Sequence, residues 1–153
     1  MSDLKSKSSM APDLIIYTDG AARGNPGPAA SGFVVFSANN RIYEESKYLE
    51  VATNNIAEHT AVLMALEWLQ KNFANQRKII FFNIDSLLVV RQLNGDFKVK
   101  SLKILEVVKK SKSLEKELGL DIRFNHIPRE ENADADTLVN RELDEQLQSL
   151  ENE

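Results

Sequence analysis

Two short apolar runs, each ending at an aspartate, limit most strongly what this chain can fold into. Residues 14–18 and 78–84 are rich in β-branched and aromatic side chains and stop at Asp19 and Asp85. Runs of this length and composition are typical of buried strands. In residues 55–73, small and apolar side chains recur every three or four positions, which indicates an amphipathic helix. The combination predicts a fold of the α/β class.

Turn signals divide the rest of the chain into further strands and helices. Residues 24–28 contain two prolines and two glycines, so we expect an irregular loop there. Residues 32–36 and 41–48 are the two arms of a predicted hairpin. Two helices, a strand and a terminal helix are expected later, at residues 86–93, 102–118, 121–127 and 133–150. The resulting order is β-β-β-α-β-α-α-β-α.

The length and composition fit one globular domain. The chain has 153 residues, of which 42% are hydrophobic and 27% charged; we expect a disordered leader over residues 1–12 and a folded domain over residues 13–150. No cysteine is present, which excludes disulfides, thiolate zinc sites and cysteine nucleophiles. No apolar run approaches the roughly 18 residues that a membrane span needs. A cytoplasmic monomer with no membrane contact is the expectation.

The charge of the chain bears on its partners. A net charge of −4 argues against a surface that is basic throughout. Six lysines lie between residues 98 and 112, and we interpret this run as the solvated face of a helix. A local basic face that contacts nucleic acid is the alternative.

Four carboxylates stand where predicted strands end or predicted helices begin: Asp19, Glu58, Asp85 and Asp136. If the fold gathers them, they form an oxygen-only site for hard divalent metals. Each also has a structural alternative. Asp19 fits a turn and Asp85 a helix cap. Glu58 follows Asn55 at the spacing of a capping box, and Asp136 suits the positive end of a helix dipole.

The segments around these carboxylates are more specific than any one of them. Taken together and in order, they closely resemble the conserved blocks of the type 1 ribonuclease H family: residues 17–28, 53–58, 85–95 and 126–138. The resemblance extends over residues 14–143. It implies a ribonuclease H-like fold with a mixed five-stranded sheet flanked by helices, in which the first three strands are antiparallel and the others run parallel to the first.

The resemblance also implies a reaction. By position, Asp19, Glu58, Asp85 and Asp136 match the metal-binding carboxylates of the family, whereas Asp134 stands two places early and is a candidate for a supporting role only. Members of the family are endonucleases that hydrolyse the RNA strand of RNA/DNA hybrids and leave 5′-phosphate and 3′-hydroxyl ends. They use Mg²⁺ or Mn²⁺, and two such ions would relieve the repulsion within a cluster of carboxylates.

Further residues match positions of the family that lie outside the metal cluster. His126 aligns with a histidine that assists proton transfer or product release, although a structural role at a strand end is the alternative. Asn25, Asn54 and Asn55 match polar positions near the minor groove of the hybrid, and Thr53 matches a residue that holds a DNA phosphate. All four are also common turn and cap residues.

Two departures from the family concern the binding of nucleic acid. Leu87 stands where the family usually has a glutamine, and residues 98–123 contain no aromatic residue and one predicted helix in place of a basic protrusion. A nucleic-acid-binding module that lacks catalytic activity is therefore the main alternative function. An activity on double-stranded RNA is a further alternative. His59, next to Glu58, is expected on the helix surface.

Overall fold

A five-stranded mixed sheet with the strand order β3-β2-β1-β4-β5 forms the centre of the molecule. The computed structural model describes residues 11–96 and 98–152. The strands are β1 (Leu14–Ala22), β2 (Gly27–Ser37), β3 (Asn40–Ala52), β4 (Ile79–Ile84) and β5 (Asp121–His126). The first three strands are antiparallel, and β4 and β5 run parallel to β1. The predicted fold class and strand directions are confirmed.

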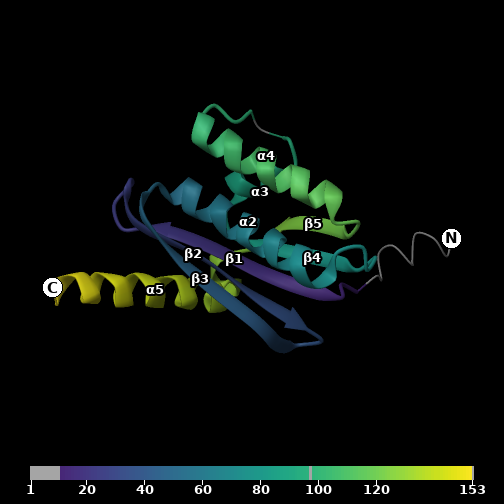
Figure 1. Ribbon diagram of the computed structural model, residues 1–153, viewed down its shortest axis with the longest axis horizontal. Helices are drawn as coiled ribbons and strands as arrows, with labels where there is room; N and C mark the ends of the chain where they lie inside the picture. The colour runs from purple at the N-terminus through teal and green to yellow at the C-terminus, as the bar shows by residue number, and fades with distance from the viewer. Residues whose placement is uncertain (1–10, 97, 153) are drawn as a thin grey trace.

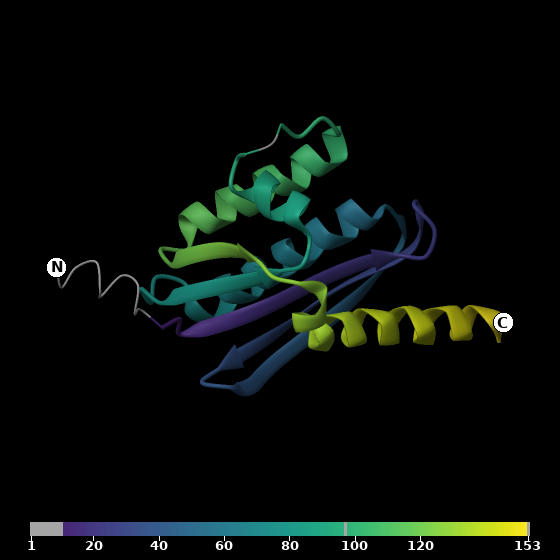
Figure 2. The same cartoon turned by 180° about the vertical axis from the view of Figure 1, so that it is seen from behind.

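Helices cover both faces of this sheet. They are α2 (Asn54–Phe73), α3 (Leu87–Leu93), α4 (Leu102–Glu117) and α5 (Ala133–Glu151), with a short 3₁₀ helix, η1 (Arg129–Glu131), before the last. Figure 1 shows α2, α3 and α4 on one face and α5 on the other, and Figure 2 shows the same layers from behind. Hydroxyl side chains begin three of the helices, since Thr53, Ser86 and Ser101 each accept a hydrogen bond from the third residue that follows.

The main core lies between the sheet and α2. The predicted apolar stripe of this helix is fully buried at Ala61, Ala65 and Leu69. It packs against Phe33 of β2 and Phe82 of β4, which are also fully buried. Burial of side chains of this size stabilises the fold by about 1.5–3 kcal/mol each. This contact fixes α2, and therefore its first turn, against the centre of the sheet.

A smaller apolar cluster holds α5 to the other face. Val139 and Leu143 pack against Ala30 of β2, and Leu138 packs near Val34 on the same strand. These positions recur at helical spacing, as the sequence predicts. The amino-terminal turn of α5 is thereby held close to the middle of β1 and β2.

The early strands are longer than expected. β1 does not stop at Asp19 but continues to Ala22, which pairs with Ala29, and β2 already begins at Gly27. The irregular segment is therefore shorter than residues 24–28. Antiparallel pairing extends the ladder across Pro28, because proline is tolerated near the start of a strand. The consequence for the site is that Asp19 lies within a strand and not in a turn.

Two expectations concern the ends and the environment of the chain. Residues 1–10 of the predicted leader lie outside the described residues, so the division into a leader and a domain at residue 13 stays a prediction. Within the part of the chain that the structure describes, no helix is both long and apolar enough to cross a membrane.

Candidate metal centre

The parallel pairing of β1 and β4 brings two carboxylates side by side. Thr18 pairs with Ile84, so Asp19 and Asp85 are the next residues along the two strands. The pairing with β4 ends there, whereas β1 continues along β2 with Asp19 opposite Gly32. Asp19 is 8% exposed and lines a depression in the surface, and Asp85 lies beside it.

The first turn of α2 supplies a third carboxylate, Glu58. This turn crosses β1 at Gly20, where a Cβ atom would overlap the backbone of Ala57 and Glu58. The hydroxyl of Ser31 on β2 donates a hydrogen bond to the carbonyl oxygen of Ala57 and holds the turn in place. The absence of a side chain at Gly20 is therefore what allows Glu58 to approach Asp19.

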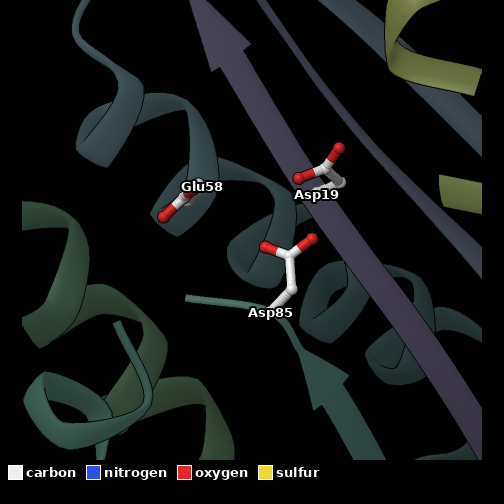
Figure 3. Close-up of side chains that lie close together, drawn as sticks. All are labelled: Asp19, Glu58 and Asp85. Atoms are coloured by element: carbon white, nitrogen blue, oxygen red, sulfur yellow. The ribbon is translucent and has the colours of Figure 1, made fainter. Parts of the chain in front are cut away.

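The three carboxylates form a compact oxygen cluster. One oxygen each from Asp19, Glu58 and Asp85 lies within 4.8 Å of the other two, and Figure 3 shows the three side chains close together, on β1, on α2 and at the end of β4. Asp136, from the first turn of α5, lines the same depression of about 300 Å³. Carboxylate oxygens are the ligands that Mg²⁺ and Mn²⁺ prefer. The arrangement fits a divalent cation.

The electrostatics of the cluster support the same conclusion. Burial raises the pKa of Asp19 to about 8, and the charges of Asp85 and Asp136 act in the same direction. Burial also raises the pKa of Glu58 to about 7, against a hydrogen bond from Ser86 and the positive charge of Arg129. The cluster therefore resists full ionisation near neutral pH. A divalent cation favours the ionised carboxylates and relieves their repulsion.

The local structure excludes two of the alternative roles. Thr53, not Asn55, caps α2, and its hydroxyl accepts from the backbone nitrogen of Ile56 at 3.2 Å. The capping box proposed for Glu58 is therefore wrong. Ser86 caps α3, so the cap role of Asp85 is wrong as well. Neither carboxylate therefore caps a helix, and Glu58 lines the depression.

The two aspartates of α5 point to different places. Asp136 lines the depression that holds Asp19 and Glu58. Asp134 pairs with Arg41 at 2.7 Å and lines a separate depression bordered by Tyr17. Both aspartates lie in the first turn of α5, where the helix dipole favours a negative charge. Only Asp136 is thus brought to the cluster.

His126 is not among the residues that line this depression. It ends β5, pairs with Ile84 in the parallel register and is exposed. The positively charged residue that does line the depression is Arg129 of η1, which the sequence interpretation missed. Its place within the block at residues 126–138 was the available signal, but no local pattern shows which way its side chain turns.

The expectation for His59 is wrong. This residue is fully buried, and its Nε2 atom lies 2.7 Å from Oε1 of Gln92 on α3. Burial lowers the pKa of His59. The first turns of α2 lie between the sheet and α3, so the side of the helix next to Glu58 faces protein and not solvent.

The polar residues at the start of α2 form a connected group. The Asn54 side chain accepts from the backbone nitrogen of Ala22 at 2.8 Å, and the Asn54 backbone nitrogen donates to Oδ1 of Asn25 at 3.1 Å. The side chain of Asn55 donates to Oε1 of Gln92 at 3.4 Å. Asn54 also lines the acidic depression. Of the three asparagines, Asn54 thus borders the depression, Asn25 is bonded to Asn54, and Asn55 is bonded to α3.

Comparisons with known proteins identify relatives over most of the chain. A model of a family described as reverse transcriptase-like matches residues 17–142. The structure of LC11-RNase H1, isolated from compost, is similar with a TM-score of 0.82 and 42% identity over 90% of this chain and 99% of that chain. The structure of the same protein in complex with an RNA/DNA hybrid has a TM-score of 0.81 and 43% identity, over 88% of this chain and 99% of that chain.

Two further relatives come from other organisms. The structure of RNase H1 from the halophilic archaeon Halobacterium salinarum has a TM-score of 0.79 and 34% identity, over 86% of this chain and 98% of that chain. Bifunctional protein Rv2228c of Mycobacterium tuberculosis is 34% identical over 138 residues, which are 89% of this chain and 37% of the relative. The chain thus spans little more than a third of the length of that relative.

Proposed function

This chain belongs to the type 1 ribonuclease H family, and on that basis we propose that it hydrolyses the RNA strand of RNA/DNA hybrids with the help of divalent metal ions. The observation that carries the proposal is the convergence of Asp19, Glu58 and Asp85 to within 4.8 Å. A relative with 43% identity has been solved with an RNA/DNA hybrid, which supports the choice of substrate.

The carboxylates are the proposed metal ligands. Asp19, Glu58, Asp85 and Asp136 would hold Mg²⁺ or Mn²⁺, with two ions present when the substrate is bound. Such ions supply an activated water and stabilise the leaving oxygen of a phosphodiester. The chain itself contributes four charges on separate elements of a packed fold, which keeps their oxygens in place before the substrate arrives. Hydrolysis leaves 5′-phosphate and 3′-hydroxyl ends.

The group at the start of α2 is the proposed contact with the hybrid. Side-chain amides can donate to and accept from the 2′-hydroxyl groups that distinguish RNA in the minor groove. Asn25 and Asn54 are joined by a hydrogen bond of 3.1 Å, and Asn54 borders the acidic depression. Asn55 stands next to them, and Thr53 at the helix start is the proposed phosphate contact. His126 is retained as a candidate for a step outside the cluster, such as product release.

A cleavage assay tests the proposal. The purified chain with Mg²⁺ or Mn²⁺ is expected to cut the RNA of a labelled hybrid, and Asp85→Asn is expected to abolish cleavage. Asp121→Asn is the matched control, because Asp121 begins β5 at the opposite end of the parallel strands and is exposed. Equal activity of Asp85→Asn and the unaltered chain would contradict the assignment of the site.

The same assay separates the alternative functions. A nucleic-acid-binding module without catalysis would bind the hybrid but show no turnover at any metal concentration; the 44% exposure of Leu87, where the family usually has a glutamine, makes this the second candidate. Double-stranded RNA and single-stranded RNA serve as parallel substrates and test the range of the activity.

We propose that the chain is a cytoplasmic monomer, and light scattering on the purified protein tests whether it is monomeric.

A further inference from the structure

Asn132, directly before α5, is placed like a helix cap but does not act as one. Asparagine at this position commonly accepts a hydrogen bond from a backbone nitrogen of the first turn. The Asn132 side chain makes no such bond and is 1% exposed. Its Nδ2 atom instead donates to the carbonyl oxygen of Thr18 at 2.9 Å and to Oδ2 of Asp85 at 3.0 Å.

The contacts of Asn132 connect the parts of the chain that carry three carboxylates of the cluster. Thr18 immediately precedes Asp19 on β1, and Asp85 immediately follows β4. The backbone oxygen of Asn132 also accepts from the backbone nitrogen of Asp136 at 3.0 Å. One residue therefore contacts the strand that carries Asp19, the carboxylate of Asp85 and the helical turn that carries Asp136.

The chemistry of the two partners requires an amide donor at this position. The Thr18 carbonyl and the Asp85 carboxylate are both acceptors, so the NH₂ group of Asn132 must face them. An aspartate of the same shape would present oxygen to oxygen. The Oδ1 atom of Asn132 is buried and has no hydrogen-bond partner among the described residues, which costs stability. Packing alone therefore does not account for a polar residue here.

We propose that Asn132 is a positioning residue of the metal centre: its amide fixes the orientation of the Asp85 carboxylate and ties it to β1 beside Asp19. This inference rests on the proposed function, since it names a residue that supports the same site. Groups that orient metal ligands typically contribute 10–100-fold to metal affinity or activity. We expect an effect of that size from the loss of the Asn132 amide.

The experiment compares Asn132→Ala and Asn132→Leu with Leu143→Ala in the full chain. Leucine has the same branched arrangement of four side-chain heavy atoms as asparagine but no donor, so it serves if the alanine variant folds poorly. Leu143 is fully buried on the same helix and packs against Ala30, away from the carboxylates. Leu143→Ala therefore reports the effect of a destabilised α5 alone.

The first measurement is the binding of Mn²⁺ in the absence of nucleic acid, from the rise of the melting temperature with metal concentration. Both Asn132 variants are expected to bind Mn²⁺ about 10–100-fold more weakly than the unaltered chain. Leu143→Ala is expected to melt at a lower temperature but to keep its Mn²⁺ affinity within about threefold, because its core contact lies away from the cluster.

The second measurement is kinetic. With the RNA/DNA hybrid as the substrate, the Asn132 variants are expected to lose kcat about 10–100-fold while KM changes less than about threefold, because the amide contacts a metal ligand and not the nucleic acid. Mn²⁺ affinity within twofold of the unaltered chain in both Asn132 variants would overturn the inference. An equal loss of affinity in Leu143→Ala, or no Mn²⁺ binding by the unaltered chain, would overturn it too.

The two readouts keep this inference separate from the proposed function. If the unaltered chain binds Mn²⁺ but does not cut the hybrid, the proposed function fails, and the comparison of Mn²⁺ affinities still decides the role of Asn132. If it cuts the hybrid and the Asn132 variants bind Mn²⁺ normally, the positioning role alone fails.

Discussion

The carboxylate of Asp19 shows how the site opposes the stability of the fold. Its pKa is raised from 3.8 to about 8, chiefly by burial. The unfolded chain releases this proton near the ordinary pKa, whereas the folded chain retains it to much higher pH. Because the folded state then binds more protons than the unfolded state, the free energy of unfolding falls as the pH rises through this range.

Asp19→Asn removes the charge and should therefore stabilise the metal-free protein at high pH. At pH 8 in EDTA we expect the variant to be more stable than the unaltered chain by about 4–6 kcal/mol, since the pKa is raised from 3.8 to about 8 and each unit of raised pKa corresponds to about 1.4 kcal/mol. Near pH 4 the difference should largely disappear. Urea denaturation at both pH values measures it.

Bound metal acts against this effect. Excess Mn²⁺ should stabilise the unaltered chain at pH 8, by about 2.7 kcal/mol at one hundred times the dissociation constant, but not Asp19→Asn. Asp121→Asn, at an exposed carboxylate away from the cluster, is the control and should behave as the unaltered chain. A metal-free Asp19→Asn variant less stable at pH 8 than the unaltered chain would contradict the electrostatic interpretation.

At the scale of elements, the crossing of α2 over β1 decides whether the carboxylates meet. A Cβ atom on Gly20 would overlap the backbone of Ala57 and Glu58, so Gly20→Ala should push the first turn of α2 away from β1. Overpacking of this kind costs about 1–3 kcal/mol or more. We expect a loss of that size in urea denaturation, together with weaker Mn²⁺ binding.

Gly95 supplies the matched glycine control. Its φ is +80°, and a Cβ atom at this position would have no other atom within 4 Å. Gly95→Ala therefore introduces backbone strain of about 1–2 kcal/mol without a clash. Its Mn²⁺ affinity should stay unchanged. If Gly20→Ala also keeps the Mn²⁺ affinity of the unaltered chain, the close approach of α2 and β1 is not what positions Glu58.

The contact between α2 and α3 depends on a buried hydrogen bond between His59 and Gln92, at 2.7 Å. Gln92→Leu leaves Nε2 of His59 without its partner, and His59→Leu leaves Oε1 of Gln92 with only the longer bond from Asn55 at 3.4 Å. Each change should cost about 1–3 kcal/mol. The double variant should cost less than the sum of the two, with a coupling of about 0.5–1.5 kcal/mol. Urea denaturation of the four proteins measures this cycle.

His126 provides the comparison for this cycle. It is an exposed residue at the end of β5, and His126→Leu should change the stability by less than about 0.5 kcal/mol. Additive costs for His59→Leu and Gln92→Leu, within about 0.3 kcal/mol, would show that the two side chains do not stabilise each other.

The order of the elements could be predicted from the sequence because each has a strong local pattern. Residues 55–73 repeat apolar positions at helical spacing, and α2 (Asn54–Phe73) follows them closely. The extent of β1 and β2 could not be predicted in the same way, because Gly27 pairs with Ala52 and the backbone nitrogen of Ala22 donates to the side chain of Asn54, both far along the chain. Local propensity does not contain that information.

At the scale of the whole molecule, the gathering of the carboxylates depends on the sheet topology. Each carboxylate alone had an equally good local explanation, and the caps made by Thr53 and Ser86 were not distinguished from those at Asn55 and Asp85. The resemblance of four segments, in order, to one family is what favours a shared metal site over these local roles. The position of Arg129 in the depression depends on long-range packing, which no periodicity of the sequence encodes. The burial of His59 does follow the helical period, because Val62 and Leu66, three and seven residues on, are also fully buried.

The charge of the whole molecule predicts how it binds a polyanion. With a net charge of −4, affinity for the hybrid must come from a local set of lysines and arginines and should fall steeply with salt. Figure 1 shows the beginning of α4 on the same side of the molecule as the end of β1. Lys103 lies in this first turn of α4 and is exposed, so it is the lysine of α4 that we expect to contact a phosphate.

The salt dependence of hybrid binding tests this placement. In an inactive Asp85→Asn background, Lys103→Gln should weaken binding and reduce the slope of log K against log salt by about one, the contribution of a single phosphate contact. Lys116→Gln, at the opposite end of α4 and equally exposed, should leave affinity and slope unchanged. If Lys103→Gln and Lys116→Gln both keep the slope of the background protein, the lysines of α4 form a solvated helix face. The phosphate contacts would then have to come from Arg129 and the residues that begin α2.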